Sequence, residues 1–305
     1  MEVHKRFGTT DIFMLLGVIF WALNFSVIKI ALREFTPLGF NGIRLIFASG
    51  ILLLFLFISG EGFLVSKKDL LMLCILGLCG NTVYQMLFIH GINLTTASNS
   101  SIIIAMSPVF IAMLSSSVRH EKLNYVAWVG ILISFMGFYF VVTKQAGNVQ
   151  FSLKNVQGDL MIFLGILFWA VYTVFSKPLL EKISPLKLTS LTMSIGTVFY
   201  IPFCLKDVRE ISFGKVSFQA WAGLFYSGVF ALAICYVIWY ASVKRVGNSR
   251  TAIYDNLVPV LTVVFAYFSL GERITVLQAG GALIILVGVY LARSGYRWLE
   301  KREAN

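Results

Sequence analysis

The sequence predicts an all-α integral membrane protein in which ten transmembrane helices form two inverted five-helix repeats around a central cavity. Three observations support this prediction: a strongly apolar composition, ten apolar runs of membrane-spanning length, and a stretch of sequence that occurs twice. Of 305 residues, 58% are hydrophobic and 13% are charged. Such a chain is too apolar for a soluble globular protein, and we expect the lipid bilayer to be its solvent.

The first apolar run follows a short basic segment and covers 12–32. Basic residues before an apolar run are typical of a signal peptide, but this run is long for one and no small-residue cleavage site closes it. At 1.5 Å per residue, about 20 residues cross the roughly 30 Å of a hydrocarbon core. We therefore expect a retained transmembrane helix.

Nine further runs of similar length follow the first. The seventh is short and contains several hydroxyl residues and Pro202. A helix buried among other helices tolerates these, because neighbouring groups satisfy the freed backbone. The ten expected spans are 12–32, 38–59, 70–90, 96–118, 123–143, 159–179, 188–205, 218–241, 249–270 and 274–293.

The distribution of Lys and Arg predicts the orientation. With the amino terminus inside, the inner segments carry fifteen of these residues and the outer segments carry seven. Cytoplasmic loops hold the excess of positive charge, so we expect a multi-pass protein of the cell (plasma or inner) membrane with both termini in the cytoplasm. The net charge of +11 then follows from topology, and it gives no reason to expect nucleic-acid binding.

The duplicated stretch begins in the first span. Shifting the sequence by 148 places lays 159–186 on 11–38, with eight identities in the first 22 positions, where composition alone gives about two. A shift of 151 aligns the later parts of the two halves. The sequence therefore predicts two repeats, 1–147 and 148–305, and the later identities pair Ser98, Pro108, Val109, Glu121, Gly130, Leu132, Ile133, Gly137 and Tyr139 with Ser249, Pro259, Val260, Glu272, Gly281, Leu283, Ile284, Gly288 and Tyr290.

Five spans is an odd number, so the second repeat enters the membrane in the opposite orientation to the first. Inverted repeats of this kind characterise many secondary transporters, whose substrate site lies at the repeat interface near mid-bilayer. Channels and inert bundles also arise by duplication. The favoured function is nevertheless transport of a small solute.

Several short motifs follow one another along the first half in a fixed order. They are Trp21 with Asn24, Pro37-Leu38 with Arg44, Pro108-Val109, Glu121, Gly130 and Gly137. In this order and spacing they resemble the EamA module, and two such modules in one chain resemble the ten-helix permeases of the drug/metabolite transporter superfamily.

The resemblance implies that helices one, three and four, with their counterparts six, eight and nine, surround a central cavity. It also implies transport of small organic solutes such as amino acids, other metabolites or drug-like compounds, often by export. One departure is visible, because Arg44 of the first half aligns with Thr192 of the second. Any role of that arginine is therefore not duplicated.

Helical spacing selects the residues expected to line the cavity. Amides avoid lipid, and a tryptophan ten residues into a span lies too deep for an interfacial belt. Trp239, near the inner end of its run, suits such a belt. The predicted cavity residues are Trp21, Asn24, Asn81, Tyr84, Gln85, Trp169, Tyr172, Tyr236, Asp255 and Asn256. Aromatic rings and amides together suit an amphipathic solute better than a bare ion.

Asp255 is the acidic residue that lies deepest in any predicted span. A carboxylate at that depth is paired, hydrated or protonated. Three interpretations stand: a proton-coupling site, a structural partner for Lys29, Arg44 or Lys177, or a helix boundary that lies elsewhere than predicted. Arg44 itself lies near a span end and suits either interfacial anchoring or an inward-facing role. Pro108 and Pro259 predict bends in the fourth and ninth spans, serving either gating or a static kink.

Motifs for catalysis, metal binding and cofactor binding are missing from the sequence. His120-Glu121 begins like a zinc-protease motif, but Asn124 stands where the second histidine is needed. Phosphate-binding loops and nucleophile elbows are also missing, so we expect no catalytic residues, metal or cofactor. The predicted partners are the lipid bilayer, a small-molecule substrate and, as one option, the proton. An intramembrane enzyme acting on lipid and a channel remain as alternatives, and the oligomeric state stays open.

Overall fold

The computed structural model describes residues 8–118, 125–143 and 153–303, and all regular structure in these ranges is helical. The first repeat contains α1 (Thr9–Ala31), α2 (Pro37–Ile58), α3 (Lys67–Gly77), the π-helix η1 (Leu78–Val83), α4 (Tyr84–Leu94), α5 (Ala97–Ile104), α6 (Ser107–Ser117) and α7 (Tyr125–Thr143). The second contains α8 (Leu153–Leu180), α9 (Pro185–Glu210), the 3-10 helix η2 (Phe213–Lys215), α10 (Phe218–Tyr226), the π-helix η3 (Ser227–Ile234), α11 (Cys235–Val246), α12 (Asn248–Ala252), the 3-10 helix η4 (Ile253–Leu257), α13 (Val258–Leu270) and α14 (Val276–Glu303).

The helical segments correspond in order to the ten predicted spans. In the described part of the chain, seven helical stretches are long and apolar enough to cross a membrane. Three shorter apolar helices at Tyr125–Val141, Tyr254–Leu270 and Val276–Leu291 complete the set. Many large apolar side chains are exposed on the outside of the bundle, as expected of a surface in contact with lipid. The predicted all-α membrane fold with two inverted repeats is confirmed.

The seventh span is a continuous helix of 26 residues, longer than its apolar run suggests. The hydroxyl side chains within the run do not interrupt the helix, because each donates to the carbonyl oxygen four residues earlier. The donor–acceptor pairs are Thr189 to Pro185 (2.8 Å), Ser190 to Leu186 (2.7 Å), Thr192 to Leu188 (2.8 Å), Ser194 to Ser190 (2.7 Å) and Thr197 to Met193 (2.8 Å). Serine and threonine can therefore lie at membrane depth without an unsatisfied hydroxyl group.

The pseudo-two-fold axis can be located from contacts between equivalent residues. Ser49 and Thr197 are related by the 148-residue shift, and their hydroxyl oxygens lie 2.7 Å apart. Gln85 and Tyr236 are related by the 151-residue shift, and the Gln85 amide donates to the Tyr236 hydroxyl at 2.7 Å. A residue touches its own symmetry mate only on the axis, so the axis passes between α2 and α9 and then through the middle of the bundle.

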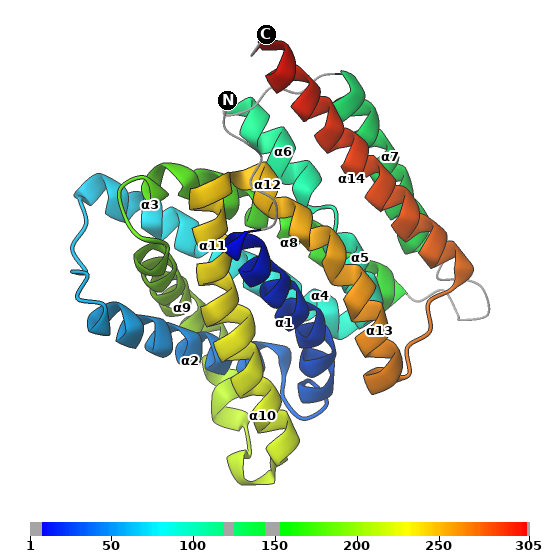
Figure 1. Cartoon of the computed structure of the whole chain (residues 1–305). Helices are drawn as coiled ribbons and strands as arrows, with labels where there is room; N and C mark the ends of the chain where they lie inside the picture. Colours follow the sequence, from blue (N-terminus) through cyan, green and yellow to red (C-terminus); the bar gives the residue numbers. More distant parts are fainter. Residues whose placement is uncertain (1–7, 119–124, 144–152, 304–305) are drawn as a thin grey trace.

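The two last helices of the repeats, α7 and α14, pack against each other along one flank of the bundle, opposite α2 and α9 (Figure 1). Glycines allow the close approach. A Cβ atom on Gly137 would lie 2.7 Å from the Gly281 carbonyl oxygen, and one on Gly288 would lie 2.5 Å from the Gly130 carbonyl oxygen. Small residues serve this purpose in membranes, where no hydrophobic force drives helices together.

Spans four and nine are interrupted in the middle. In span four α5 ends at Ile104 and α6 begins at Ser107, and in span nine α12 passes through the 3-10 helix η4 before α13 begins at Val258. Pro108 and Pro259 each occupy the first turn of the segment after the break. A proline is tolerated at that position because its missing N–H group would have no intrahelical partner there. The two predicted bend positions therefore coincide with helix breaks.

Candidate functional site

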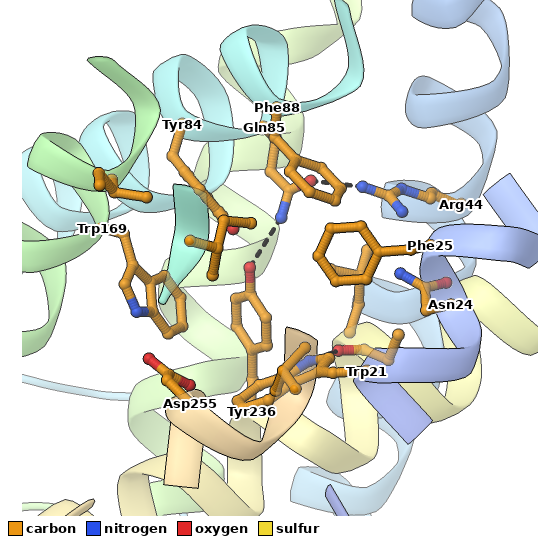
Figure 2. Close-up of a pocket in the computed structure, with 15 residues that line it drawn as sticks. Trp21, Asn24, Phe25, Arg44, Tyr84, Gln85, Phe88, Trp169, Tyr236 and Asp255 are labelled. Atoms are coloured by element: carbon orange, nitrogen blue, oxygen red, sulfur yellow. Dashed lines mark hydrogen bonds between the residues drawn. The ribbon is translucent and has the colours of Figure 1, made fainter. Parts of the chain in front are cut away.

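A cavity lies at the seam between the two repeats. Its volume is about 60 Å³, far below the roughly 300–1,000 Å³ of typical small-molecule sites. A larger solute fits only after helices move apart. The lining side chains, of which Figure 2 labels ten, are Trp21, Asn24, Phe25, Arg44, Tyr84, Gln85, Phe88, Ile104, Ile166, Trp169, Ala231, Leu232, Tyr236, Asp255 and Val258.

An aromatic cluster forms one side of this cavity. Trp169 of α8 packs against Trp21 of α1, Tyr84 of α4 and Tyr236 of α11, with ring centroids 6.4, 5.4 and 5.2 Å apart. The Trp21 indole donates to the Ala231 carbonyl oxygen at 2.9 Å, which fixes the ring against η3. The cavity is therefore walled by rings held in place by elements of both repeats.

Trp239 of α11 belongs to the same cluster. Its ring lies 5.6 Å from Trp21 and 5.4 Å from Trp169, and its side chain is fully buried. The prediction that it lies in an interfacial belt is wrong. Distance from the end of an apolar run measures depth along one helix, but not which face of that helix meets its neighbours.

Polar groups connect the opposite side of the cavity. The Gln85 side chain donates to Tyr236, and its carbonyl oxygen accepts from the Arg44 guanidinium at 2.5 Å (Figure 2). Arg44 also donates to Asn41 Oδ1 and to Ser227 Oγ, both at 2.7 Å. With 1% of its surface exposed, Arg44 faces inward and is not an interfacial anchor.

Asp255 lies in η4, where span nine is interrupted, and only 4% of its surface is exposed. Its Oδ2 atom accepts a hydrogen bond of 2.5 Å from Ser107 Oγ at the break in span four. Its predicted pairing with Lys29, Arg44 or Lys177 is not found among the described ion pairs. Both helix breaks therefore meet at this carboxyl group.

Seven of the ten predicted cavity residues line the cavity, and the other three lie elsewhere. The seven are Trp21, Asn24, Tyr84, Gln85, Trp169, Tyr236 and Asp255. Asn81 is fully buried in η1, and the Tyr172 hydroxyl lies 2.6 Å from Thr192 Oγ1, so both contribute to packing of span three and of α8 near α9. Asn256 is partly buried beside Asp255 in η4 and is not part of the lining.

The two π-helices occupy equivalent positions in the repeats. Both η1 in span three and η3 in span eight end just before residues that line the cavity, Tyr84 and Gln85 in one repeat and Tyr236 in the other. A π segment adds a residue to the helical turn and so rotates the side chains that follow it. It is often found at functional sites for this reason.

Groups of acidic, histidine or cysteine residues that could hold a metal are not found in the described part of the chain. Its four cysteines are free, two of them buried.

Comparison with known proteins identifies this architecture. The model of the EamA-like transporter family matches the chain twice, at residues 8–143 and at residues 156–294. The chain belongs to the EamA-like transporter family. The resemblance inferred from the order of short motifs is therefore confirmed, and this EamA-like chain is a membrane transporter.

Relatives of this EamA-like transporter match it over most of their length. A protein of Archaeoglobus fulgidus named "Uncharacterized transporter" is 32% identical over 92% of this chain and 96% of its own. A protein of Streptantibioticus cattleyicolor named "Probable terminal-alkyne amino-acid exporter" is 28% identical over 91% of each chain. One solved crystal structure, 16% identical, shares the fold with a TM-score of 0.70 over 96% of this chain and 99% of its own.

Several lining residues of this EamA-like transporter were not predicted. Phe25, Phe88 and the aliphatic residues are apolar, and an apolar side chain in an apolar span gives no signal of the face it occupies. Arg44 did give a signal, because it is charged, lies within a span and has no counterpart in the second repeat. The six helices implied by the resemblance supply all lining residues except Arg44, which comes from α2.

Proposed function

We propose that this chain is a secondary carrier that moves a small amphipathic organic solute across the cell membrane by alternating access, most simply in the direction of export. The central cavity carries the proposal. Both repeats contribute to it, aromatic rings face polar groups across it, and its small volume of about 60 Å³ belongs to a closed state of a cycle.

Two features support a rocking movement around this site. Spans four and nine are broken beside Asp255, so the half-helices on either side can tilt without bending a continuous hydrogen-bond ladder. On the face predicted to be extracellular, Glu272 accepts from the backbone N–H groups of Ala97 and Ser98, at 2.9 and 3.0 Å, and closes α5 against the end of span nine. Opening on that face requires this contact to break.

The nature of the solute is supported by the wall of the cavity and by one relative. Aromatic faces bind apolar bodies, and the amide and charged groups orient a polar head. The printed name of the Streptantibioticus cattleyicolor relative includes amino-acid export, which supports an amino acid or a related metabolite. An enzyme acting on lipid needs a nucleophile with a base or clustered acids, and the lining residues provide neither.

Cysteine accessibility tests the proposal without knowledge of the solute. The four native cysteines are replaced by alanine, and Phe25→Cys in the cavity is compared with Leu54→Cys on the lipid-facing surface, which is 56% exposed. We expect a membrane-impermeant maleimide to reach the cavity cysteine from either side of the membrane, and to leave the lipid-facing one unmodified. Cysteines added at the two chain ends should react only from the cytoplasm.

Two outcomes would overturn the proposal. One is a pair of chain ends on opposite sides of the membrane, and the other is a cavity cysteine sealed from both sides. Unitary currents in a planar bilayer would show that the chain is a channel and not a carrier, because no rocking cycle reaches channel rates.

A further inference from the structure

The guanidinium of Arg44 is a buried cation that has no counter-ion in the described part of the chain. All three of its hydrogen-bond acceptors are neutral: the side-chain oxygens of Asn41, Ser227 and Gln85, at 2.7, 2.7 and 2.5 Å. Among the described residues, no carboxylate forms an ion pair with it. Burial of a charge is strongly unfavourable unless an opposite charge compensates it, so the site is incomplete as it stands.

The geometry around Arg44 leaves room for an acceptor. A guanidinium has five N–H donors in one plane, and three are used, which leaves one on each terminal nitrogen. The rings of Phe40 and Phe88 lie 5.6 and 5.8 Å from its central carbon and restrict the approach of other groups. A close contact with η3 fixes its backbone, because a Cβ on Gly228 would lie 3.1 Å from the Arg44 carbonyl oxygen.

The cavity gives a ligand access to Arg44. Arg44 is part of its lining, and Figure 2 shows it on the side opposite Asp255, with the Gln85–Tyr236 hydrogen bond between them. Asn24 lies on the same side as Arg44, and its buried Oδ1 atom has no partner among the described residues. Among the described lining residues on this side, the polar groups that lack partners are therefore two guanidinium donors and one amide oxygen.

We infer that Arg44 is the binding subsite for a carboxylate, and that the solute of the proposed carrier is an organic carboxylate with an apolar or aromatic body. This inference rests on the proposed function and narrows its substrate class. One unused N–H group on each terminal nitrogen can donate to the two oxygens of a carboxylate, and the rings of Trp21, Phe25 and Trp169 receive the apolar body. An α-amino acid with an apolar side chain belongs to this class, and so does the same acid without its amino group.

Two matched series of compounds test the inference on the wild-type protein. The first is L-phenylalanine, 3-phenylpropanoate, L-phenylalaninamide and 2-phenylethylamine, and the second is L-leucine, 4-methylpentanoate, L-leucinamide and 3-methylbutylamine. The readouts are the melting temperature of the purified chain and counterflow in proteoliposomes. We expect at least one carboxylate to raise the melting temperature and drive counterflow, and its amide or amine to bind about tenfold or more weakly, since each factor of ten is about 1.4 kcal/mol.

Two variants locate the subsite. Arg44→Gln should remove the preference for carboxylates, whereas Arg33→Gln, a change in an exposed arginine on the loop after α1, should leave it unchanged. Gln85→Glu keeps Arg44 and places a fixed carboxylate against it with almost the same shape. We expect this variant to melt higher without ligand and to lose its response to carboxylates, which tests the subsite even where Arg44→Gln fails to fold.

Three results would overturn the inference. They are equal binding of a carboxylate and its amide by the wild type, an unchanged preference in folded Arg44→Gln or Gln85→Glu protein, and no response to any member of either series. In each case the accessibility experiment on Phe25→Cys still decides whether the chain is a carrier, so the two failures are distinguishable.

Discussion

At the scale of single residues, the chemistry of this transporter depends on few ionisable side chains within the membrane. Arg44 and Asp255 line the same cavity from opposite sides and are not paired with each other. Lys29, in contrast, lies near a helix end, and its amino group donates to carbonyl oxygens at the end of span three, at 3.1 Å to Ile92 and 2.8 Å to Thr95. Lys29 and Arg44 are both basic and both lie near a span end, so the face of the helix, rather than charge or depth, separates the cavity residue from the anchoring one.

Asp255 is the residue from which we expect pH dependence of transport. The charged and titratable groups that line the cavity with it are Arg44, Tyr84 and Tyr236, which ordinarily titrate at about pH 10 or above. If Asp255 binds and releases a proton during the cycle, Asp255→Asn should flatten the dependence of transport rate on external pH, because an amide side chain does not titrate in this range. Counterflow in proteoliposomes at a series of pH values measures this.

The control for this prediction is Glu181→Gln, which changes an exposed carboxylate after α8 and should retain the wild-type profile. An Asp255→Asn protein with the wild-type rate and profile would remove proton coupling through this residue. It would leave the carboxylate subsite at Arg44 untouched.

At the scale of elements, irregular helices build the site. The π-helices η1 and η3 and the breaks beside Pro108 and Pro259 recur at equivalent positions in both repeats. Regular helices would satisfy more backbone hydrogen bonds. Irregular helical segments of this kind are common at functional sites. None of the described side chains of the regular helices α7 and α14 lines the cavity, and the two helices pack against each other on the flank.

The α7 and α14 pair provides a stability prediction. Gly137→Leu should lower the free energy of unfolding by about 1–3 kcal/mol, since the added side chain meets the backbone of α14 at a site with no free space. Gly50→Leu is the matched control, because nothing lies within 4 Å of a Cβ atom at Gly50. Equal stability of the two variants in a denaturation series would show that the helices are not held together at this contact.

At the scale of the whole molecule, the inverted repeat determines which parts of the structure the sequence could predict. The apolar runs predicted ten spans, and the identities at two fixed shifts predicted the inversion of the second repeat, because duplication leaves its record in residue order. The helices around the cavity were implied by the resemblance to the EamA module. The side of each helix that faces the cavity was harder to predict. Trp239 was predicted in the wrong place, and Asn81, Tyr172 and Asn256 lie outside the lining. A mostly apolar span lacks the broad polar face that marks orientation in a soluble helix. Hydrogen-bond partners, such as Ser107 for Asp255, depend on the positions of the helix breaks. The spacing of polar and apolar residues does not reveal these breaks.

Symmetry also relates two contacts that join the repeats at opposite ends of the bundle. Glu34, in the loop after α1, accepts from the backbone N–H and the hydroxyl of Ser217 at the start of span eight, at 2.7 and 2.6 Å. The 148-residue shift takes Glu34 to Lys182, which pairs with Asp69 at the start of span three, 2.7 Å away. Each contact ties the loop after the first helix of one repeat to the third span of the other.

The contact of Glu34 should make thermal stability depend on pH on the acid side. Hydrogen bonds from the Ser217 side chain and backbone lower the pKa of Glu34 from its ordinary value of 4.5. A lowered folded-state pKa adds stability that is complete above the ordinary value and is lost as pH falls through the folded-state value. Glu34→Gln should therefore melt below the wild type at neutral pH, and the gap should close as the pH falls below about 4.5. Glu181→Gln should show no such gap, and a Glu34→Gln curve parallel to that of the wild type through this range would mean that the carboxylate does not hold the two repeats together.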